Sequence, residues 1–304
     1  MSIVVQGVTK FYGKQKALDN VSFEVKTGEI VGFLGPNGAG KSTMMKIITG
    51  FIPPSSGNVF VNGIETSNGS LEIKKKIGYL PENNPLYPEM YVREYLRFTA
   101  SLYKSDITVK KQIDSIIEVT GLAPEQSKKI GSLSKGYRQR VGLAQALIHN
   151  PDVLILDEAT TGLDPNQIVE IRNLIREAGR EKTVMLSTHI MQEVEAICNR
   201  VIIIDKGVIV ADEEKKNIYS KISQAKQIIL VEFDKDPDEA SLKAIPFVDS
   251  VKKSIANTWL IEASGDQDIR PAIFSFAVSN NLTVLSLQKK ENNLEEVFRL
   301  LTNG

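Results

Sequence analysis

Residues 35–42 read Gly-Pro-Asn-Gly-Ala-Gly-Lys-Ser, and this stretch decides the fold. It fits the pattern G-x-x-x-x-G-K-[ST], in which glycines allow several backbone N–H groups to converge on phosphate oxygens. The apolar run 30–34 before it predicts a buried strand, and residues 42–49 after it predict a helix that ends at Gly50. A strand, a glycine-rich loop and a helix in this order indicate a nucleoside triphosphate site.

Several positions of this loop have expected roles in holding a triphosphate. The start of the helix contributes the positive end of its dipole, which favours bound phosphate. The ammonium group of Lys41 can bridge the β- and γ-phosphates, and the hydroxyl group of Ser42 can ligate Mg²⁺. The predicted nucleotide-binding residues of the loop are Gly35, Pro36, Asn37, Gly38, Ala39, Gly40, Lys41, Ser42 and Thr43.

The chain has 304 residues, about twice the ~150 residues typical of one domain, and this length predicts two units. Hydrophobic residues make up 42% and charged residues 24%, which excludes a disordered chain, a collagen-like repeat and a coiled-coil rod. Its 37 basic residues balance 37 acidic residues, so no net charge attracts nucleic acid or anionic lipid. We expect no nucleic-acid partner.

Cysteine usage and hydropathy predict the compartment. Cys198 is the single cysteine, so an internal disulfide is excluded, and residues 1–10 lack the basic and apolar parts of a signal peptide. The longest apolar runs, such as 153–156 and 201–204, fall far short of the ~18 residues that a membrane span needs. We expect a cytoplasmic protein without a membrane span of its own, whose work at a membrane requires a partner.

The pattern over the first two thirds of the chain predicts an α/β fold. Apolar stretches separated by glycine turns predict several strands in residues 1–34, and a hairpin follows at 58–64. Helical periodicity then predicts an insert over about 90–149, with helices at 92–103, 108–120 and 135–149. Short buried strands at 153–156, 183–187 and 201–205, with a crossover helix at 166–180, predict a parallel sheet that the last of these strands closes.

A different kind of segment follows a charged linking helix expected at 213–225, so we place the domain boundary near 220. The predicted domains are residues 1–219 and 220–304. In the second, the predicted strands are 227–233, 247–253, 258–263 and 283–288, and the predicted helices are 241–244, 269–279 and 294–301. This order of elements is that of a small α+β domain of the ferredoxin-like type.

Two carboxylates, Asp157 and Glu158, follow the predicted strand 153–156. Ligands of open α/β sheets bind at the carboxyl ends of the strands, so both side chains are expected at the site. Asp157 suits the metal ion, and Glu158 suits the group that orients or deprotonates the attacking water. The alternative is an acidic pair that merely ends a strand in solvent.

Residues 133–140 read Leu-Ser-Lys-Gly-Tyr-Arg-Gln-Arg, and here the chain resembles the ATP-binding subunits of ABC transporters. The signature of that family reads L-S-G-G-Q at this place. The resemblance implies that Ser134, Lys135 and Gly136 contact the γ-phosphate of ATP held by the opposite subunit. Lys135 and Tyr137, in the third and fifth places, depart from the family pattern. A local interpretation stays open, because Ser134 also suits the N-cap of the helix 135–149.

The resemblance covers roughly residues 1–210 and extends to four more positions. Tyr12 matches the aromatic residue that stacks on adenine, and Glu82 stands where the family has a glutamine that touches Mg²⁺. Asp164 matches a loop that bridges the two sites of a dimer, and His189 matches the histidine that links the γ-phosphate to the catalytic glutamate. Read locally, Tyr12 is a core aromatic, Asp164 belongs to a turn, and His189 is a structural or exposed histidine. His149, the second histidine, is expected at a helix end on the surface.

The resemblance implies an ATPase that uses ATP and Mg²⁺. The implied catalytic residues are Lys41, Glu158 and His189, and the implied metal ligands are Ser42, Glu82 and Asp157. Residues 33–37, 78–82 and 294–298 resemble the exporter-type subfamily called ABC-2. Residues 78–86 together with 91–96 resemble its gliding-motility-associated ATP-binding proteins.

As implied partners we name a permease in the membrane and a second ATP-binding subunit, expected to be another copy of this chain. The protein is then expected at the inner face of the cell membrane, held there by the permease. The alternative is a soluble ABC-type mechano-ATPase acting on DNA or ribosomes. The second domain is either a regulatory or dimerising module or a stabilising appendage.

Overall fold

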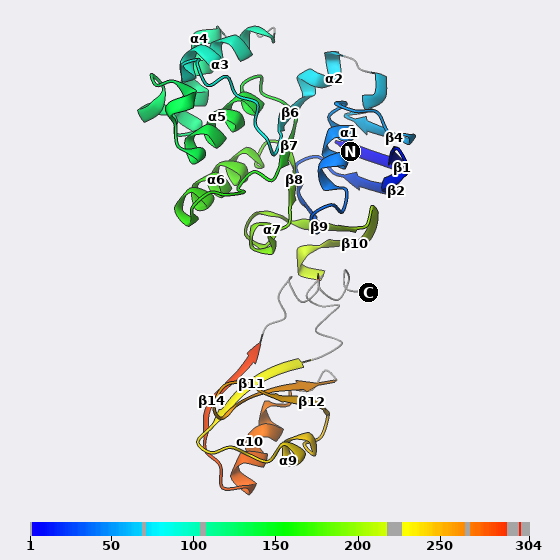
Figure 1. Ribbon diagram of the computed structural model, residues 1–304, viewed down its shortest axis with the longest axis vertical. Coiled ribbons are helices and arrows are strands. Elements are labelled where there is room, and N and C mark those ends of the chain that lie inside the picture. The colour runs from blue at the N-terminus through cyan, green and yellow to red at the C-terminus, as the bar shows by residue number, and fades with distance from the viewer. Residues whose placement is uncertain are drawn as a thin grey trace. The chain divides into compact units, whose positions relative to one another are not determined.

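The computed structural model describes residues 2–68, 71–103, 108–217, 227–264, 268–290 and residue 298. The chain divides into two compact units, Met1–Glu213 and Glu214–Gly304 (Figure 1). Each unit has its own hydrophobic core. None of the helices in the described ranges is both long enough and apolar enough to cross a membrane.

The first unit begins with an antiparallel sheet of order β2-β1-β4-β5. Its strands are β1 (Ile3–Tyr12), β2 (Gln15–Val25), β4 (Ser56–Val61) and β5 (Ile64–Glu65). Alternate apolar side chains such as Ile3 and Val5 are buried on one face, as the period of two requires. The turn between β1 and β2 pairs Tyr12 with Gln15, which fixes Tyr12 at the end of the sheet.

A second sheet of order β10-β9-β3-β8-β7-β6 forms the centre of the first unit. Its strands are β3 (Ile30–Leu34), β6 (Ile77–Leu80), β7 (Val153–Asp157), β8 (Thr183–Thr188), β9 (Arg200–Asp205) and β10 (Val208–Glu214). Five adjacent strands, in the order β9-β3-β8-β7-β6, pair in parallel, so their carboxyl ends meet at one edge. The register sets Leu34 beside Thr188, and Asp157 beside Ser187. The predicted α/β fold is confirmed.

Helices complete this unit. They are α1 (Lys41–Ile48), α2 (Leu71–Lys76), α6 (Pro165–Ala178) and α7 (Met191–Ile197), with the short 3₁₀ turn η1 (Thr66–Asn68). The helical insert holds α3 (Val92–Ser101), α4 (Val109–Val119) and α5 (Lys135–Leu147), with the 3₁₀ turns η2 (Ala123–Glu125) and η3 (Ile130–Ser132). Figure 1 shows α3, α4 and α5 gathered to one side of β6 and β7.

One prediction at the end of this sheet was wrong, and another was misplaced by two residues. The strand 201–205 does not close the sheet, because Lys206 and Gly207 adopt φ angles of 46° and 83° and turn the chain into β10. The linking helix expected from residue 213 begins at residue 215, because residues 213 and 214 belong to β10 and residues 215–217 are helical. Residues 218–225 of that expected helix lie outside the described residues. The elements α2, β6 and α7 were not predicted.

The second unit has the expected ferredoxin-like topology. Its strands are β11 (Gln227–Phe233), β12 (Val248–Lys253), β13 (Thr258–Ala263) and β14 (Val284–Lys290), and its helices are α9 (Glu239–Lys243) and α10 (Arg270–Ser279). The sheet order is β12-β13-β11-β14 with antiparallel pairing throughout. The predicted helix 294–301 falls outside the described residues except for residue 298.

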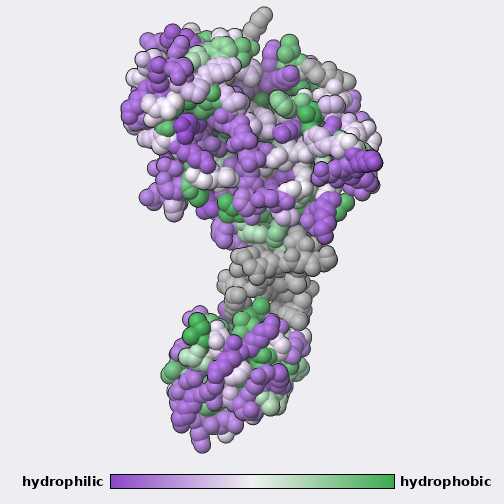
Figure 2. Space-filling model, in the orientation of Figure 1, coloured by the Kyte–Doolittle hydropathy of each residue, from purple (hydrophilic) through white to green (hydrophobic). Residues whose placement is uncertain are grey.

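Figure 2 shows polar side chains over most of the visible face of the first unit, with apolar side chains in small separate groups. Scattered apolar groups of this kind are normal on a protein surface.

Candidate functional site

The phosphate-binding loop joins β3 to α1 and depends on glycine at two positions. Gly38 and Gly40 adopt φ angles of 81° and 110°, which other residues rarely adopt. A Cβ atom at Gly40 would also lie 2.6 Å from the carbonyl oxygen of Ala17, on β2. The loop is therefore held closely against the antiparallel sheet, with α1 starting directly behind it.

Lys41, the first residue of α1, turns its side chain back over the loop. Its Nζ donates hydrogen bonds to the carbonyl oxygens of Gly35 at 2.8 Å and Pro36 at 3.1 Å. The carboxylate of Glu158 lies 3.7 Å away. Burial lowers the pKa of Lys41, although the charges of Glu158 and Asp157 oppose this effect. The loop therefore keeps a buried ammonium group at its mouth, where phosphate oxygens would bind.

Asp157 ends β7 and lies directly across from the start of α1. Its Oδ1 accepts a hydrogen bond from the hydroxyl of Ser42 at 3.1 Å and another from the hydroxyl of Ser187. The side chain is buried, and burial raises the pKa of Asp157, with the two hydrogen bonds opposing the shift. A serine hydroxyl and a buried carboxylate are hard oxygen donors, the kind that Mg²⁺ prefers.

Glu158 and His189 face one another at the carboxyl ends of β7 and β8. The Nδ1 atom of His189 lies 3.0 Å from Oε1 and 2.9 Å from Oε2 of Glu158. Thr161 donates a hydrogen bond of 2.8 Å to the same Oε2. Glu158 has a φ angle of 52°, unusual for a residue other than glycine, and this turn points its carboxylate toward the loop. The carboxylate is thus fixed from two sides.

Lys41, Ser42, Glu158 and His189 line one cavity of about 480 Å³, whose lining does not include Asp157. Its lining residues are Tyr12, Gln15, Ala17, Asn37, Gly38, Gly40, Lys41, Ser42, Thr43, Glu82, Glu158, Thr161 and His189. The structure therefore brings the phosphate loop together with the predicted aromatic, acidic and histidine residues. Gln15, Ala17 and Thr161 were not among the predicted site residues. The β1–β2 pairing that brings Gln15 beside Tyr12 could have suggested the first of them.

The predicted signature residues lie outside this cavity. The hydroxyl of Ser134 accepts a hydrogen bond from the backbone N–H of Tyr137 at 3.3 Å and caps α5. Asp164 caps α6 in the same way, through the N–H of Gln167 at 3.0 Å. The side chain of Gln167 packs against Gly136. Within one chain, then, these residues cap and pack helices and do not reach the nucleotide cavity of that chain.

The two loops of this second group also touch one another. The side chain of Lys135, an exposed residue in the first turn of α5, lies against Gly162 in the loop before α6. Gly162 has a φ angle of 72°, and a side chain at this position would collide with Lys135. A displacement of the 161–164 loop would therefore move the side chain of Lys135 at the start of α5.

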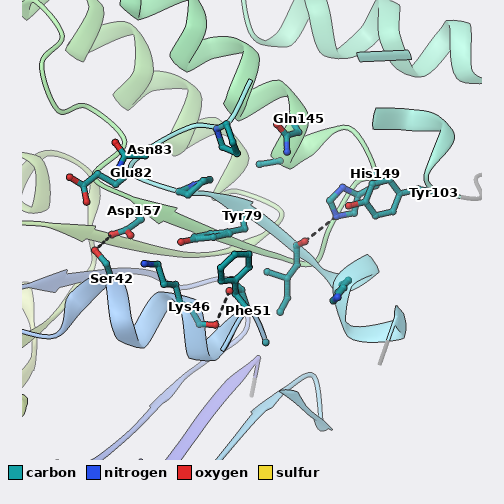
Figure 3. A pocket seen from close by; sticks show the side chains of 17 residues that line it. Ser42, Lys46, Phe51, Tyr79, Glu82, Asn83, Tyr103, Gln145, His149 and Asp157 are labelled. Carbon is teal, nitrogen blue, oxygen red and sulfur yellow. Dashed lines mark hydrogen bonds between the residues drawn. The ribbon is translucent and has the colours of Figure 1, made fainter. Parts of the chain in front are cut away.

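A second and larger cavity, of about 730 Å³, lies between the central sheet and the helical insert (Figure 3). Phe51 and Tyr103 line it together with charged residues such as Lys46 and Lys74. Burial raises the pKa of Tyr79, whose hydroxyl group is buried without a hydrogen-bond partner among the described residues. Figure 3 shows Glu82 and Asp157 at one end of this cleft and His149 at the other. We name this cavity the insert cleft.

His149 is not the surface residue that the sequence suggested. Its ring stacks on Tyr103 with centroids 4.1 Å apart, and its Nε2 lies 3.2 Å from the carbonyl oxygen of Ile77. Burial lowers the pKa of His149. Since α5 ends at Leu147, the ring turns inward and packs against β6 and the insert.

Ser42 and Glu82 line both cavities. Glu82 follows β6, so the strand places it between the phosphate loop and the insert cleft. The two cavities are therefore neighbours that share part of their walls, and a change at Glu82 alters both.

Comparison with known proteins identifies the chain. The family model described as ABC transporter matches residues 18–161. The linearmycin resistance ATP-binding protein LnrL of Bacillus subtilis (strain 168) is 34% identical over 303 residues, covering 98% of this chain and 97% of LnrL. The Nod factor export ATP-binding protein I of Neorhizobium galegae is 34% identical, covering 99% of this chain and 85% of that protein.

A solved structure agrees with these matches. The dimeric post-hydrolysis state of the ATP-binding cassette MJ0796 bound to ADP and Pi gives a TM-score of 0.65 at 29% identity, covering 70% of this chain and 98% of that chain. The chain belongs to the ATP-binding proteins of ABC transporters and is an ATPase.

Proposed function

We propose that this ATPase powers an exporter of the ABC-2 type. The observation that carries the proposal is the insert cleft, which shares Ser42 and Glu82 with the nucleotide cavity. Such an arrangement allows a partner seated in the cleft to respond to ATP in the neighbouring cavity. The export named for the Nod factor relative supports this direction of transport, and residues 78–86 together with 91–96 favour the branch that resembles the gliding-motility-associated proteins.

For hydrolysis, we assign Glu158 as the general base that activates the attacking water. His189 holds this carboxylate through its Nδ1 and is close enough to the cavity to reach the γ-phosphate. Lys41 stabilises negative charge on the phosphates, and Tyr12 stacks on adenine. Asn37 and Thr43, which also line the cavity, lie with the glycines along the phosphate chain.

The residues at the end of β7 suit a magnesium ion. We assign its coordination to the Ser42 hydroxyl and Asp157, with Glu82 as a further oxygen ligand at the shared wall. When bound, Mg²⁺ neutralises charge on the β- and γ-phosphates.

A second copy of the chain completes the site. Ser134 and Asp164 lie at helix starts away from their own nucleotide cavity, and both Ser134 and Lys135 are exposed. We assign them, with the Gly136 backbone, to the γ-phosphate bound by the other copy, where the dipole of the 13-residue helix α5 favours negative charge. ATP then closes the dimer, and hydrolysis reopens it.

The insert cleft is the proposed seat of the permease. Phe51 is 74% exposed there, and Tyr79 lines the same cleft. An apolar contact with a few convergent polar groups is typical of a docking site. The permease in turn holds the protein at the inner face of the membrane. We further propose that residues 1–219 act as the ABC-type domain and 220–304 as an accessory domain.

Co-purification tests this function. The tagged chain is recovered from detergent-solubilised membranes of its own cells, and its partners are identified by mass spectrometry. We expect a polytopic membrane protein with the unaltered chain and its loss with Phe51→Asp in the cleft. The matched control is Phe247→Asp, because Phe247 is 63% exposed but lies on the second unit. Recovery only with ribosomal or DNA-bound proteins would instead support the soluble mechano-ATPase.

A further inference from the structure

A carboxylate that the assigned chemistry does not use is buried at the turn that carries His189. Glu193, in the first turn of α7, is fully buried. Burying an ionisable group is costly unless it makes compensating interactions, so its position needs an explanation. Three residues separate it from His189, and the backbone between them forms the turn from β8 into α7.

Glu193 is joined to this turn by a hydrogen-bonded chain. The hydroxyl of Thr188, the last residue of β8, donates a hydrogen bond of 2.7 Å to Oε2 of Glu193. The same Thr188 oxygen accepts a hydrogen bond of 3.0 Å from the backbone N–H of Ile190. These two hydrogen bonds hold Thr188 and Ile190, the residues directly before and after His189. The side chain of His189 itself stays 41% exposed.

The rest of the environment supports a positioning role. Burial raises the pKa of Glu193, while the hydrogen bond from Thr188 and the charge of Arg172 oppose that shift. The other oxygen, Oε1, has no hydrogen-bond partner within the described part of the chain. Within the described residues, Thr188 donates a hydrogen bond to this carboxylate, and Thr188 is also hydrogen-bonded within the turn that carries His189.

We propose that Glu193 is a positioning residue for ATP hydrolysis, which acts through Thr188 to hold the turn that keeps His189 against Glu158. The inference rests on the proposed role of His189 and adds the group that sets its place. A small displacement of a catalytic group is costly, since a shift of about 1 Å can reduce a rate by roughly 100-fold. A purely structural role, in which Glu193 stabilises the first turn of α7 through the helix dipole, predicts that Thr188 is dispensable.

The test compares substitutions that remove or keep the hydrogen bonds. Thr188→Val removes the hydroxyl at nearly constant volume, and Thr188→Ser keeps it. Glu193→Leu removes the acceptor, and Glu193→Gln keeps it. Thr120→Val is the matched control, because Thr120 is equally buried and its hydroxyl bonds only to the Ile116 carbonyl among the contacts described. We expect a roughly tenfold fall in kcat for Thr188→Val and Glu193→Leu, with the KM for ATP unchanged. Thr188→Ser and Glu193→Gln should retain kcat.

A second readout observes the imidazole itself. The chain has two histidines, so NMR spectra of the imidazole rings contain two sets of signals. The His189 signals should shift in Thr188→Val and Glu193→Leu, and the His149 signals should not. If kcat and the His189 signals of Thr188→Val match those of Thr120→Val, the proposal is wrong. If His189→Ala keeps full turnover, the assigned role of His189 fails, and the ring signals still decide whether Glu193 positions the imidazole.

Discussion

The Nδ1 atom of His189 lies within 3.0 Å of both carboxylate oxygens of Glu158. The two side chains come from neighbouring parallel strands, β7 and β8, and meet where those strands end. Thr161 donates to the same carboxylate at 2.8 Å. Two side chains of the same chain therefore hold the carboxylate that we assign as the base, and a fixed orientation of this kind favours efficient proton transfer.

Glu158→Gln should keep ATP binding and lose turnover. The amide retains the size and the hydrogen-bond acceptor of the side chain but cannot take a proton from water. General-base catalysis contributes about 100-fold to 10,000-fold, so kcat should fall within that range. A phosphate-release assay measures turnover, and analytical ultracentrifugation with ATP should show a trapped dimer. Unchanged turnover would remove Glu158 from the role of base.

Lys41→Ala should lose ATP binding itself. The Nζ atom is the buried cation at the mouth of the loop, bonded to the carbonyls of Gly35 and Pro36. Removing it leaves the phosphates without their principal positive partner. Isothermal titration with ATP measures the loss, and Lys16→Ala, a change at an exposed lysine on β2, is the control. Equal affinity in the two variants would contradict the assignment.

Asp157→Asn should stabilise the nucleotide-free protein while impairing its use of Mg²⁺. Burial raises the pKa of Asp157, so the protonated form is favoured in the folded state. The stability that protonation provides is lost as the pH rises through the raised pKa, and an amide avoids that loss. Without nucleotide or metal at pH 8, the unfolding midpoint should rise by roughly 2–4 °C for each kcal/mol gained.

The pH dependence provides the control for that prediction. The advantage of Asp157→Asn should shrink as the pH falls through the raised pKa, because both side chains are then neutral. Calorimetry at several pH values measures this difference. A gap that grows toward acid pH would show that burial is not the cause.

Gly40→Ala should be more damaging than Gly38→Ala. Both glycines have positive φ angles, so each substitution introduces backbone strain of about 1–2 kcal/mol. Only the new Cβ at Gly40 also collides with the carbonyl of Ala17, whereas the one at Gly38 meets open space. Thermal unfolding without nucleotide should therefore show the larger loss for Gly40→Ala. Equal losses would mean that strain alone decides.

Ile261→Ala should destabilise the second unit without affecting hydrolysis. Ile261 is fully buried in the core of that unit, and such truncations cost about 2–5 kcal/mol. Trp259, the single tryptophan of the chain, lies in the same core and reports its unfolding by fluorescence. Leu285→Ala, at a residue that is 59% exposed, should have little effect. A loss of ATP turnover in Ile261→Ala would contradict the separation of the two cores.

Much of the fold could be predicted because its signals are local. Buried strands such as β7 and the centre of β8 are continuous apolar runs, and β11 of the second unit contains the apolar run 228–231. The strand β6 could not be found in this way. Its four residues include Gly78, which has poor strand propensity, and they form a strand because Ile77 pairs with Val153 across the sheet.

The site residues likewise fall into those with a local sequence signal and those without one. The phosphate loop and the pair Asp157 and Glu158 are contiguous in sequence, so a pattern can find them. The contact between Thr161 and Glu158 depends on the φ angle of 52° at Glu158, and the burial of Glu193 depends on how α7 packs. Neither the contact nor the burial can be predicted from the spacing of residues in the sequence.

The wall that the two cavities share has a thermodynamic consequence. Ser42 and Glu82 belong to both, so a ligand that repositions either side chain in one cavity changes the shape of the other and with it the free energy of filling that cavity. Linkage makes this effect reciprocal: if ATP tightens the binding of a partner in the insert cleft by some factor, that partner tightens ATP by the same factor. The affinity for ATP measured on the isolated protein then differs from its affinity with a partner in the cleft. An increase in affinity when the partner binds would mean that the partner favours the ATP-bound form, and a decrease would mean the opposite.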